Sequence, residues 1–284
     1  MKNLLISFSG GETSAMMTSM ILKLALERYE KTVVVFANTG EENEATLQFV
    51  AECDRQFQFG TVWLEAVVHP GRVGTMYKMV NVQTAARHGE PYEAVIQKYG
   101  IPNNKFPHCT RELKERPIKA LIDTLGWRKG DYHIAVGIRA DEAERRSKNP
   151  GAIIYPFLDW WQVTKKDVNK FWAAQSFRLR LAGYQGNCKW CWKKSDRKLL
   201  TILDEAPEKF DFPARMEAQY GLVGPEFKKT IAPGYHRTFF RSNRSVRELQ
   251  MLHDTTEWTH PDNDALDVED GGCKESCEVN FEEV

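Results

Sequence analysis

Residues 7–14, Ser-Phe-Ser-Gly-Gly-Glu-Thr-Ser, decide the fold of this chain. They follow the apolar residues 4–6 and precede apolar residues at helical spacing, so the order is strand, glycine turn, helix. Two adjacent glycines let the backbone approach a ligand closely. Amides at a helix start, helped by the helix dipole, hold anions. The stretch therefore predicts a phosphate or pyrophosphate site, and a plain turn is the alternative.

The composition indicates an ordinary soluble protein, because 42% of the 284 residues are hydrophobic and 27% are charged. A chain of this length forms one large domain, or one domain with an appendage. The formal net charge is zero, so the charge of the whole molecule argues neither for nor against a nucleic-acid partner. Because no stretch reaches transmembrane length and the N-terminus lacks a secretory pattern, we expect a cytoplasmic protein without a membrane partner.

Charge is unevenly distributed in the last part of the chain. Residues 253–284 hold eleven acids and a single lysine, Lys274. We predict a nucleotide-binding domain over 1–206, a basic appendage over 207–252 and an acidic, flexible tail over 253–284. The basic residues that crowd the appendage are Lys228, Lys229, Arg237, Arg241, Arg244 and Arg247.

Strands and helices alternate along the first two thirds of the chain. This alternation predicts an α/β fold, a Rossmann-like parallel sheet with helices on both faces. Ligands of such sheets sit beyond the carboxyl ends of the strands. The predicted strands are 2–8, 31–37, 61–68 and 132–138, and the predicted helices are 13–29, 44–55 and 165–181. Residues 70–107 are expected to be irregular apart from short helices.

Two further polar motifs follow predicted strands. The turn Asn-Thr-Gly at 38–40 ends the second strand, and Glu44 begins the next helix; ligand contact and simple helix capping are both compatible with this pattern. Arg139 follows the fourth strand and Arg145 lies further along the same segment. Guanidinium groups suit bidentate contact with phosphate or sulfate oxygens, and a solvated charge run is the alternative.

These segments, in their order, resemble the PP-loop superfamily of adenine nucleotide α-hydrolase-like proteins, and within it the phosphoadenosine phosphosulfate (PAPS) reductase family. Residues 9–14 are similar to its SGGxTS loop, and 38–40 to its DTG-type turn with Asn for Asp. Residues 137–145 are similar to its G-[IL]-R-x-x-[EQ]-x-x-R motif, and 109–117 to its C-x-x-x-x-K-x-x-P element. The resemblance covers about residues 2–195. It implies that the nucleotide is held by Ser7, Ser9, Gly10, Gly11, Thr13, Ser14, Asn38, Thr39, Gly40, Glu44, Gly137, Arg139, Glu142 and Arg145.

Cysteine usage points to chemistry rather than to structural bridges. In a reducing compartment, metal, cluster or redox roles are favoured over disulfides. Cys109 opens a predicted helix, where a thiolate is favoured, and Lys114 can face the same anion as the glycine loop. Cys188 and Cys191 form a CxxC pair, which cannot complete a tetrahedral metal site alone. The six cysteines are Cys53, Cys109, Cys188, Cys191, Cys273 and Cys277.

The resemblance extends to three of these cysteines. Cys109 with Cys188 and Cys191 is similar to the ligand sets of iron–sulfur sulfonucleotide reductases and of tRNA or DNA sulfurtransferases, which implies a 4Fe–4S cluster on these residues. The fourth iron ligand is then His108, another cysteine or an exchangeable sulfur species. Structural zinc and a redox pair remain the alternatives.

The first function that this resemblance implies is that of a PAPS-reductase-like enzyme. A thiolate attacks the sulfur of a bound sulfonucleotide, and sulfite leaves from the resulting thiosulfonate, with a thiol reductant as partner. The catalytic groups are then Cys109, Lys114, Cys273 and Cys277. The family's C-terminal E-C-G-x-H setting is absent from this chain.

The second function is that of an ATP-cleaving sulfurtransferase. ATP with Mg²⁺ adenylylates an acceptor, pyrophosphate leaves, and sulfur from the cluster or from a donor protein displaces AMP. The basic appendage fits an RNA or DNA acceptor. Thr13 stands where ATP pyrophosphatases have an Asp near the metal. The third possibility, from another class, is a non-catalytic nucleotide-binding module.

Overall fold

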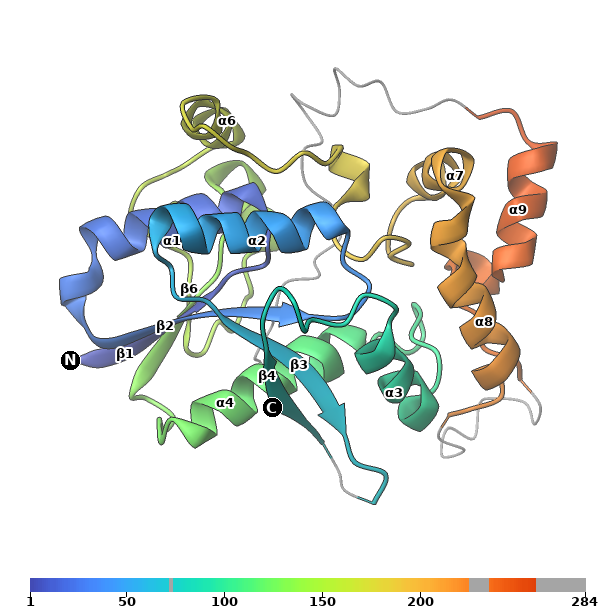
Figure 1. The fold of residues 1–284 in the computed structure, drawn as a ribbon, viewed down its shortest axis with the longest axis horizontal. Coiled ribbons are helices and arrows are strands. Elements are labelled where there is room, and N and C mark those ends of the chain that lie inside the picture. Colours follow the sequence, from blue (N-terminus) through green and yellow to red (C-terminus); the bar gives the residue numbers. More distant parts are fainter. Residues whose placement is uncertain (72–73, 225–234, 259–284) are drawn as a thin grey trace.

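The structure is a computed structural model that describes residues 1–71, 74–224 and 235–258 (Figure 1). Two of the predicted catalytic thiols, Cys273 and Cys277, lie outside the described residues. Lys228 and Lys229 of the predicted basic appendage lie outside them as well.

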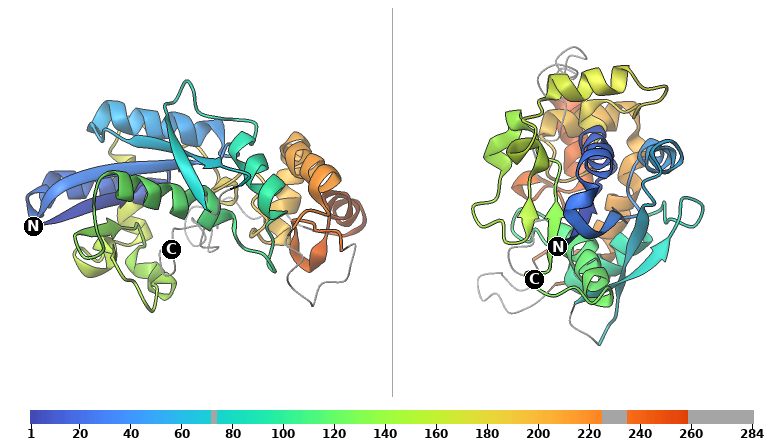
Figure 2. Two further views of the ribbon diagram at one scale, coloured as in Figure 1. Left: turned by 90° about the horizontal axis from the view of Figure 1, so that it is seen from below. Right: turned by 90° about the vertical axis from the view of Figure 1, so that its left-hand side faces the viewer.

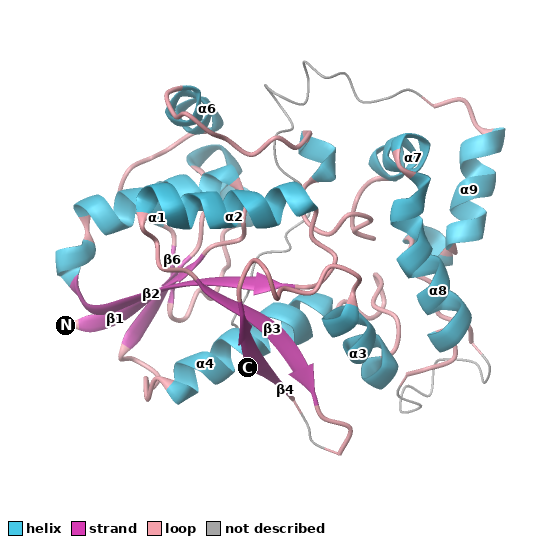
Figure 3. Ribbon diagram, viewed as in Figure 1, coloured by secondary structure: helices cyan, strands magenta, loops and turns pink. Residues whose placement is uncertain are grey.

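A six-stranded sheet in the order β4-β3-β2-β1-β5-β6 forms the centre of the first two thirds of the chain (Figure 3). Every neighbouring pair is parallel except β3 and β4, which are antiparallel. The α/β fold with a mainly parallel sheet is therefore confirmed. The strands are β1 (Lys2–Ser7), β2 (Tyr29–Asn38), β3 (Val62–Val68), β4 (Thr75–Val80), β5 (Tyr132–Ala135) and β6 (Ile153–Ile154).

Helices cover both faces of the sheet, as predicted. Successive side chains of β1 point to opposite faces, so Leu4 and Ile6 pack under α1 (Glu12–Leu24) and α2 (Glu44–Phe57). Leu5 points the other way and joins the core beneath α4 (Arg116–Thr124). Figures 1 and 2 show α1 and α2 on one face and α4 on the other. Because α1 follows the carboxyl end of β1, the start of α1 lies at the carboxyl edge of the sheet.

Several predicted elements differ in extent from those of the structure, and the strand predicted over 132–138 ends at Ala135. The helix predicted over 13–29 ends at Leu24, and β2 already begins at Tyr29, because η1 (Leu26–Arg28) intervenes. The helix predicted over 165–181 is α6 (Lys165–Ala173), and the apolar Phe177 beyond it packs as irregular chain on Trp172. The region predicted to be irregular over 70–107 contains the edge strand β4, whose partner is β3.

A second group of helices packs at one end of the sheet around its own core (Figures 1 and 2). This core joins Tyr92 of α3 with Trp190, Phe212 and Phe239, so residues from both sides of position 206 share it. The helices there are α3 (Glu90–Tyr99), α7 (Asp196–Glu205), α8 (Asp211–Tyr220) and α9 (Val246–Thr255). The remaining elements are the π-helical η2 (Arg111–Glu115), η3 (Ala140–Arg145), α5 (Pro156–Asp159), η4 (Gly183–Gln185), η5 (Pro207–Phe210) and η6 (Arg241–Asn243).

Candidate functional site

The glycine loop between β1 and α1 has the geometry of an anion-binding turn. Gly10 has φ +80°, and a Cβ there would lie 2.7 Å from Thr46 Cγ2, so only glycine fits against α2. Gly11 is the N-cap of α1. Because it has no side chain, no capping side chain accepts from the amides of the first turn, which leaves them available to an anion. The loop is held from within, because Ser14 Oγ donates to Gly11 O at 3.0 Å and lies 2.9 Å from Ser9 Oγ. Amides and hydroxyls thus converge at the positive end of a helix.

A cavity opens directly beside this loop. Its empty space, including the part open to solvent, is about 430 Å³. It lies at the carboxyl edge where β1 has β2 on one side and β5 on the other, and α/β sheets bind ligands at such switch points. Lys114 is the charged group among the described lining residues, which are Ser7, Phe8, Ser9, Ser14, Val35, Ala37, Lys114, Ile118, Val136 and Gly137.

The motif after β5 closes against the same loop. A Cβ on Gly137 would lie 3.1 Å from Ser14 Cα, so this glycine allows the end of β5 to pack on the start of α1. Arg139 is buried, and its Nη1 donates to Thr13 Oγ1 at 3.4 Å. The fold therefore brings the two predicted phosphate-binding motifs into contact.

Carboxylates surround the two predicted anion-binding arginines. Arg139 forms ion pairs with Asp141 at 3.1 Å and with Glu142 at 3.2 Å. Arg145 forms one with Glu142 at 2.6 Å. The ion pairs fix the guanidinium groups in place and offset part of their charge, so an anion here competes with carboxylates.

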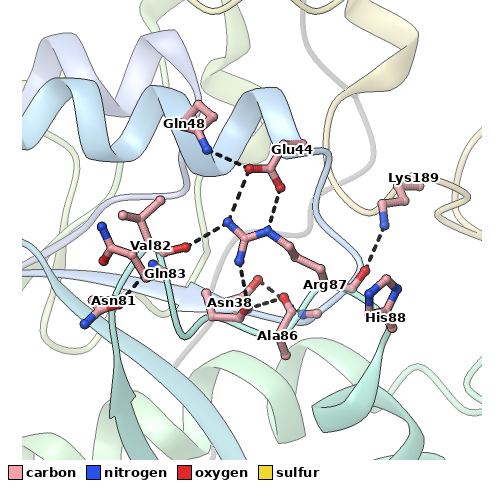
Figure 4. Close-up of polar contacts among 12 residues, drawn as sticks. Asn38, Glu44, Gln48, Asn81, Val82, Gln83, Ala86, Arg87, His88 and Lys189 are labelled. Carbon is pink, nitrogen blue, oxygen red and sulfur yellow. Dashed lines mark hydrogen bonds and ion pairs between the residues drawn. The ribbon is translucent and has the colours of Figure 1, made fainter.

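The turn after β2 is built into the scaffold of the site (Figure 4). The buried Asn38 donates through Nδ2 to Glu65 Oε1 at 2.7 Å and to Ala86 O at 2.9 Å. Gly40 has φ +80°, and a Cβ there would lie 2.9 Å from Pro91 Cδ. These contacts shape the turn, and nucleotide contact by residues 38–40 stays a prediction.

Glu44 also forms an ion pair with a side chain of the same chain (Figure 4). Its carboxylate pairs with Arg87 at 2.7 Å, and hydrogen bonds from Arg87 lower the pKa of Glu44. Arg87 in turn donates to Val82 O, and Lys189 Nζ donates to Arg87 O at 3.1 Å. This network ties the start of α2 to the segment that carries the CxxC pair.

Three of the predicted functional cysteines come together near the end of β2. Cys188 Sγ lies 3.5 Å from Thr39 Oγ1. The pKa of Tyr92 is raised well above its ordinary value, first by complete burial and then by the nearby thiols of Cys109, Cys188 and Cys191. Tyr92 also shares a hydrogen bond with Cys109. The three thiols are thus neighbours of Tyr92, and their functional role stays a prediction. Sequence reasoning missed Tyr92, because a tyrosine in a helix carries no local signal.

The helix that carries Cys109 also reaches the cavity. The helical segment begins at Cys109, as predicted, and runs through η2 into α4. Its π-helical turn inserts one extra residue per turn, and such turns are frequent at functional sites. Cys109 contributes to the core around Tyr92, whereas Lys114 lines the cavity. One short helix therefore links the thiols to the glycine loop.

The described residues contain no preformed metal centre. Within residues 1–71, 74–224 and 235–258, no group of three His, Cys, Asp or Glu side chains is arranged to hold a metal ion. His108, predicted as one fourth ligand, is buried and donates Nε2–H to Gly100 O at 3.1 Å, and burial lowers its pKa to about 4. The thiols have the soft chemistry that iron or zinc prefers, and a metal or cluster on them stays a prediction.

The basic appendage has a structural use that the sequence did not reveal. Arg237 is buried, donates to Tyr99 O at 3.1 Å and lies 3.8 Å from the ring centroid of Phe106. Arg241 donates to Lys193 O at 2.7 Å, and Arg244 pairs with Asp196. These three arginines hold the second group of helices together, so a nucleic-acid acceptor on this segment stays a prediction.

The fold and the cavity together describe an α/β protein with a glycine loop and a cavity at the carboxyl edge of its sheet. Residues 3–155 match the family model of the phosphoadenosine phosphosulfate reductase domain. The chain belongs to this family.

One similar sequence is the "Uncharacterized nin region protein ORF290" of Escherichia phage lambda, which is 30% identical over 285 residues, 96% of this chain and 94% of that protein. A crystal structure of PAPS reductase from Candida auris in a phosphate complex matches with a TM-score of 0.37 and 16% identity, over 61% of this chain and 72% of that chain. No helix among the described residues combines the length and apolar character that spanning a membrane requires.

Proposed function

We propose that this protein is a sulfonucleotide reductase that binds an adenylyl sulfate such as PAPS and releases sulfite. Two observations carry the proposal together: a cavity beside the glycine loop, and three thiols near Tyr92, of which Cys188 contacts Thr39 just after the cavity-lining strand β2. Lys114 lines the cavity, and Thr39, at the end of the strand that forms its wall, contacts Cys188. A reductase of this kind needs a phosphate cradle and a thiol within reach of the same substrate.

In this proposal the glycine loop and Lys114 bind the phosphates, and thiols carry out the reaction at sulfur. Backbone amides of the glycine loop with the hydroxyls of Ser9 and Ser14 bind the phosphates, and the ammonium group of Lys114 neutralises their charge. A thiolate attacks the sulfur of the sulfonucleotide, and the adenosine bisphosphate leaves. A second thiol then attacks the thiol sulfur of the thiosulfonate, releasing sulfite and leaving a disulfide that an external thiol reductant reduces.

An ATP-cleaving sulfurtransferase is the second proposal, favoured by the convergence of Cys109, Cys188 and Cys191 on Tyr92. A 4Fe–4S cluster on these cysteines stays a prediction of the family resemblance, and no step is assigned to it. The contact between Arg139 and Thr13 argues for the reductase instead, because it places a cation where ATP pyrophosphatases have a metal-binding Asp.

Product analysis under anaerobic conditions separates these proposals. The protein is incubated with PAPS and a dithiol in one tube, and with ATP and Mg²⁺ in another. Sulfite with adenosine 3′,5′-bisphosphate is the result we expect. AMP with pyrophosphate from the second tube would instead establish an ATP pyrophosphatase, and binding without turnover in both would indicate a non-catalytic module.

A further inference from the structure

The three described cysteines near Tyr92 differ in their exposure to solvent. Cys188 is half-buried, whereas Cys191 and Cys109 are buried. Cys188 Sγ also contacts Thr39 Oγ1 at 3.5 Å. Thr39 follows the cavity-lining Ala37 by two positions, a backbone span of about 7 Å. Of the three thiols, that of Cys188 therefore combines exposure with a position close to the cavity wall.

The CxxC segment is folded so that its two thiols are neighbours. Cys191 N–H donates to Cys188 O at 3.1 Å, which closes a four-residue turn. Such a turn brings its end Cα atoms within about 7 Å, close to the range of about 4.4–6.8 Å that a disulfide spans. The described cysteines form no disulfide, so the pair stands in its dithiol form.

Several contacts fix this turn against the end of β2. Lys189 N–H donates to Glu41 O at 2.9 Å, and Trp190 Nε1 donates to Glu41 Oε2 at 2.5 Å. The fully buried Lys194 donates through Nζ to Cys188 O at 2.7 Å. A half-buried thiol with a buried neighbour in one turn suits an attacking and a resolving cysteine.

We infer that Cys188 and Cys191 are the redox pair of the proposed reductase, an inference that rests on the proposed function. The Cys188 thiolate attacks the sulfonucleotide sulfur, a Cys188 Sγ–S bond forms, and the S–O bond to the nucleotide phosphate breaks. The Cys191 thiolate then attacks Cys188 Sγ, a disulfide forms, and sulfite leaves with the electron pair of the Sγ–S bond. Sulfate sulfur is reduced by two electrons and two thiols are oxidised, so one turnover needs no external reductant. An external dithiol reduces the disulfide afterwards.

The first test does not depend on catalysis. Reduced protein is exposed to excess oxidised glutathione, alkylated in denaturant and mapped by peptide mass. We expect a Cys188–Cys191 disulfide, with Cys53 and Cys109 alkylated. Alkylation of both CxxC thiols under these conditions would overturn the inference, because a resolving cysteine must reach its partner.

The second test is a single turnover with sulfur-labelled PAPS, protein in excess and no added reductant. The wild-type protein should release nucleotide and sulfite in equal amounts. Cys191→Ser should release the nucleotide but keep the label on Cys188 until an external thiol is added. Cys188→Ser should release neither, while Cys53→Ala, a buried control on α2, should behave as the wild type. The melting temperature and PAPS affinity of each variant verify that it is folded.

The outcomes distinguish the inference from the proposed function. If the wild-type protein reduces PAPS and Cys188→Ser does so equally well, the inference is wrong and the proposed reductase stands with another nucleophile. Label on a different cysteine has the same meaning. If the wild-type protein leaves PAPS intact even with dithiol, both are wrong.

Discussion

At the scale of single residues, contacts between distant positions decide what each motif can do. Arg139 and Thr13 are separated by 126 positions, yet the guanidinium donates to the threonine hydroxyl at 3.4 Å. The sequence predicted both as phosphate-binding groups without placing one on the other. Their contact holds a guanidinium group beside the glycine loop, where Asp141 and Glu142 offset part of its charge.

Gly11→Val should remove nucleotide binding without unfolding the protein. The nearest atom to a Cβ at this position is Ser9 Oγ at 3.7 Å, and the backbone has φ −100°, which valine adopts readily. The branched side chain would cover the first-turn amides, and losing two charge-assisted hydrogen bonds of about 1.5–3 kcal/mol each weakens affinity about a hundredfold or more. Calorimetric titration with PAPS measures the effect, and normal affinity would refute the loop assignment.

Gly10→Ala is the matched control, because it should fail for a different reason. With φ +80° and a Cβ 2.7 Å from Thr46 Cγ2, this variant strains the backbone and clashes with α2. We expect a loss of about 1–2 kcal/mol in the free energy of unfolding from the backbone alone. Thermal unfolding should therefore separate the two glycines, with Gly11→Val close to the wild type.

Lys114→Met should weaken anion binding in a salt-dependent way. Its ammonium group is the charged group among the described residues that line the cavity, and methionine keeps most of the side-chain volume. A lost charge-assisted hydrogen bond of about 1.5–3 kcal/mol corresponds to a tenfold to hundredfold weaker affinity. Lys129→Met, on an exposed turn, is the control. Equal PAPS affinity of both variants would show that Lys114 does not touch the nucleotide.

At the scale of elements, local pattern predicted the parallel core but not its edge. The segments that became β1, β2, β3 and β5 were predicted because each is a dense apolar or β-branched run. β4 was missed because its pairing with β3 is what makes it a strand, and that partner is not visible in a local window. The early end of α6 was missed for a similar reason, since Phe177 reaches the same core from irregular chain.

The pairing of β2 with β3 explains why Asn stands at position 38. Asn38 Nδ2 donates to Glu65 Oε1 at 2.7 Å, and Glu65 is completely buried on β3. Asn38→Asp, which restores the residue usual in the resembled motif, would set two carboxylates against each other. We expect a loss of about 3 kcal/mol in the free energy of unfolding near neutral pH, measured by urea denaturation.

A second substitution makes this prediction specific. Glu65→Gln supplies an amide that can donate to the carboxylate introduced by Asn38→Asp, so the double variant should regain most of the lost stability. Glu65 also pairs with Lys78 at 3.0 Å, so Glu65→Gln alone lowers the free energy of unfolding. The double-mutant cycle subtracts this loss from the interaction between positions 38 and 65. Additive effects of the two substitutions would contradict the proposed contact.

At the scale of the whole molecule, the site depends on a core that no local pattern reveals. Tyr92 of α3 packs with Trp190 at a ring-centroid distance of 5.3 Å, and Trp190 packs with Phe239 at 4.7 Å. This core brings the CxxC segment to the end of β2, where Thr39 and Cys188, 149 positions apart, meet. The sequence predicted that Lys114 faces the same anion as the loop, and the family resemblance grouped the three cysteines. Only long-range packing shows that Tyr92 and Thr39 lie beside these cysteines.

The same core makes stability depend on pH through Glu217 of α8. Its carboxylate accepts from Phe239 N–H at 3.1 Å and from Val246 N–H at 2.8 Å, and burial raises its pKa to about 7. Because the folded pKa lies above the unfolded value of about 4.5, the native state binds the proton more tightly. The stabilisation that the protonated Glu217 gives to the folded state is complete below pH 4.5 and is lost as pH rises through 7.

Glu217→Gln should therefore flatten the stability profile on its alkaline side. Burial also raises the pKa of Glu41 to about 7, so the contribution of Glu41 to the pH dependence of stability remains in the variant. His108 is buried and neutral, so it makes the free energy of unfolding rise with pH below about pH 6.5. Between pH 5 and pH 8 the wild-type free energy of unfolding should fall by about 1–3 kcal/mol more than that of the variant. Urea denaturation at both pH values measures the difference. Parallel profiles would mean that Glu217 is ionised in the native state across this range, and that its two backbone donors outweigh the effect of burial.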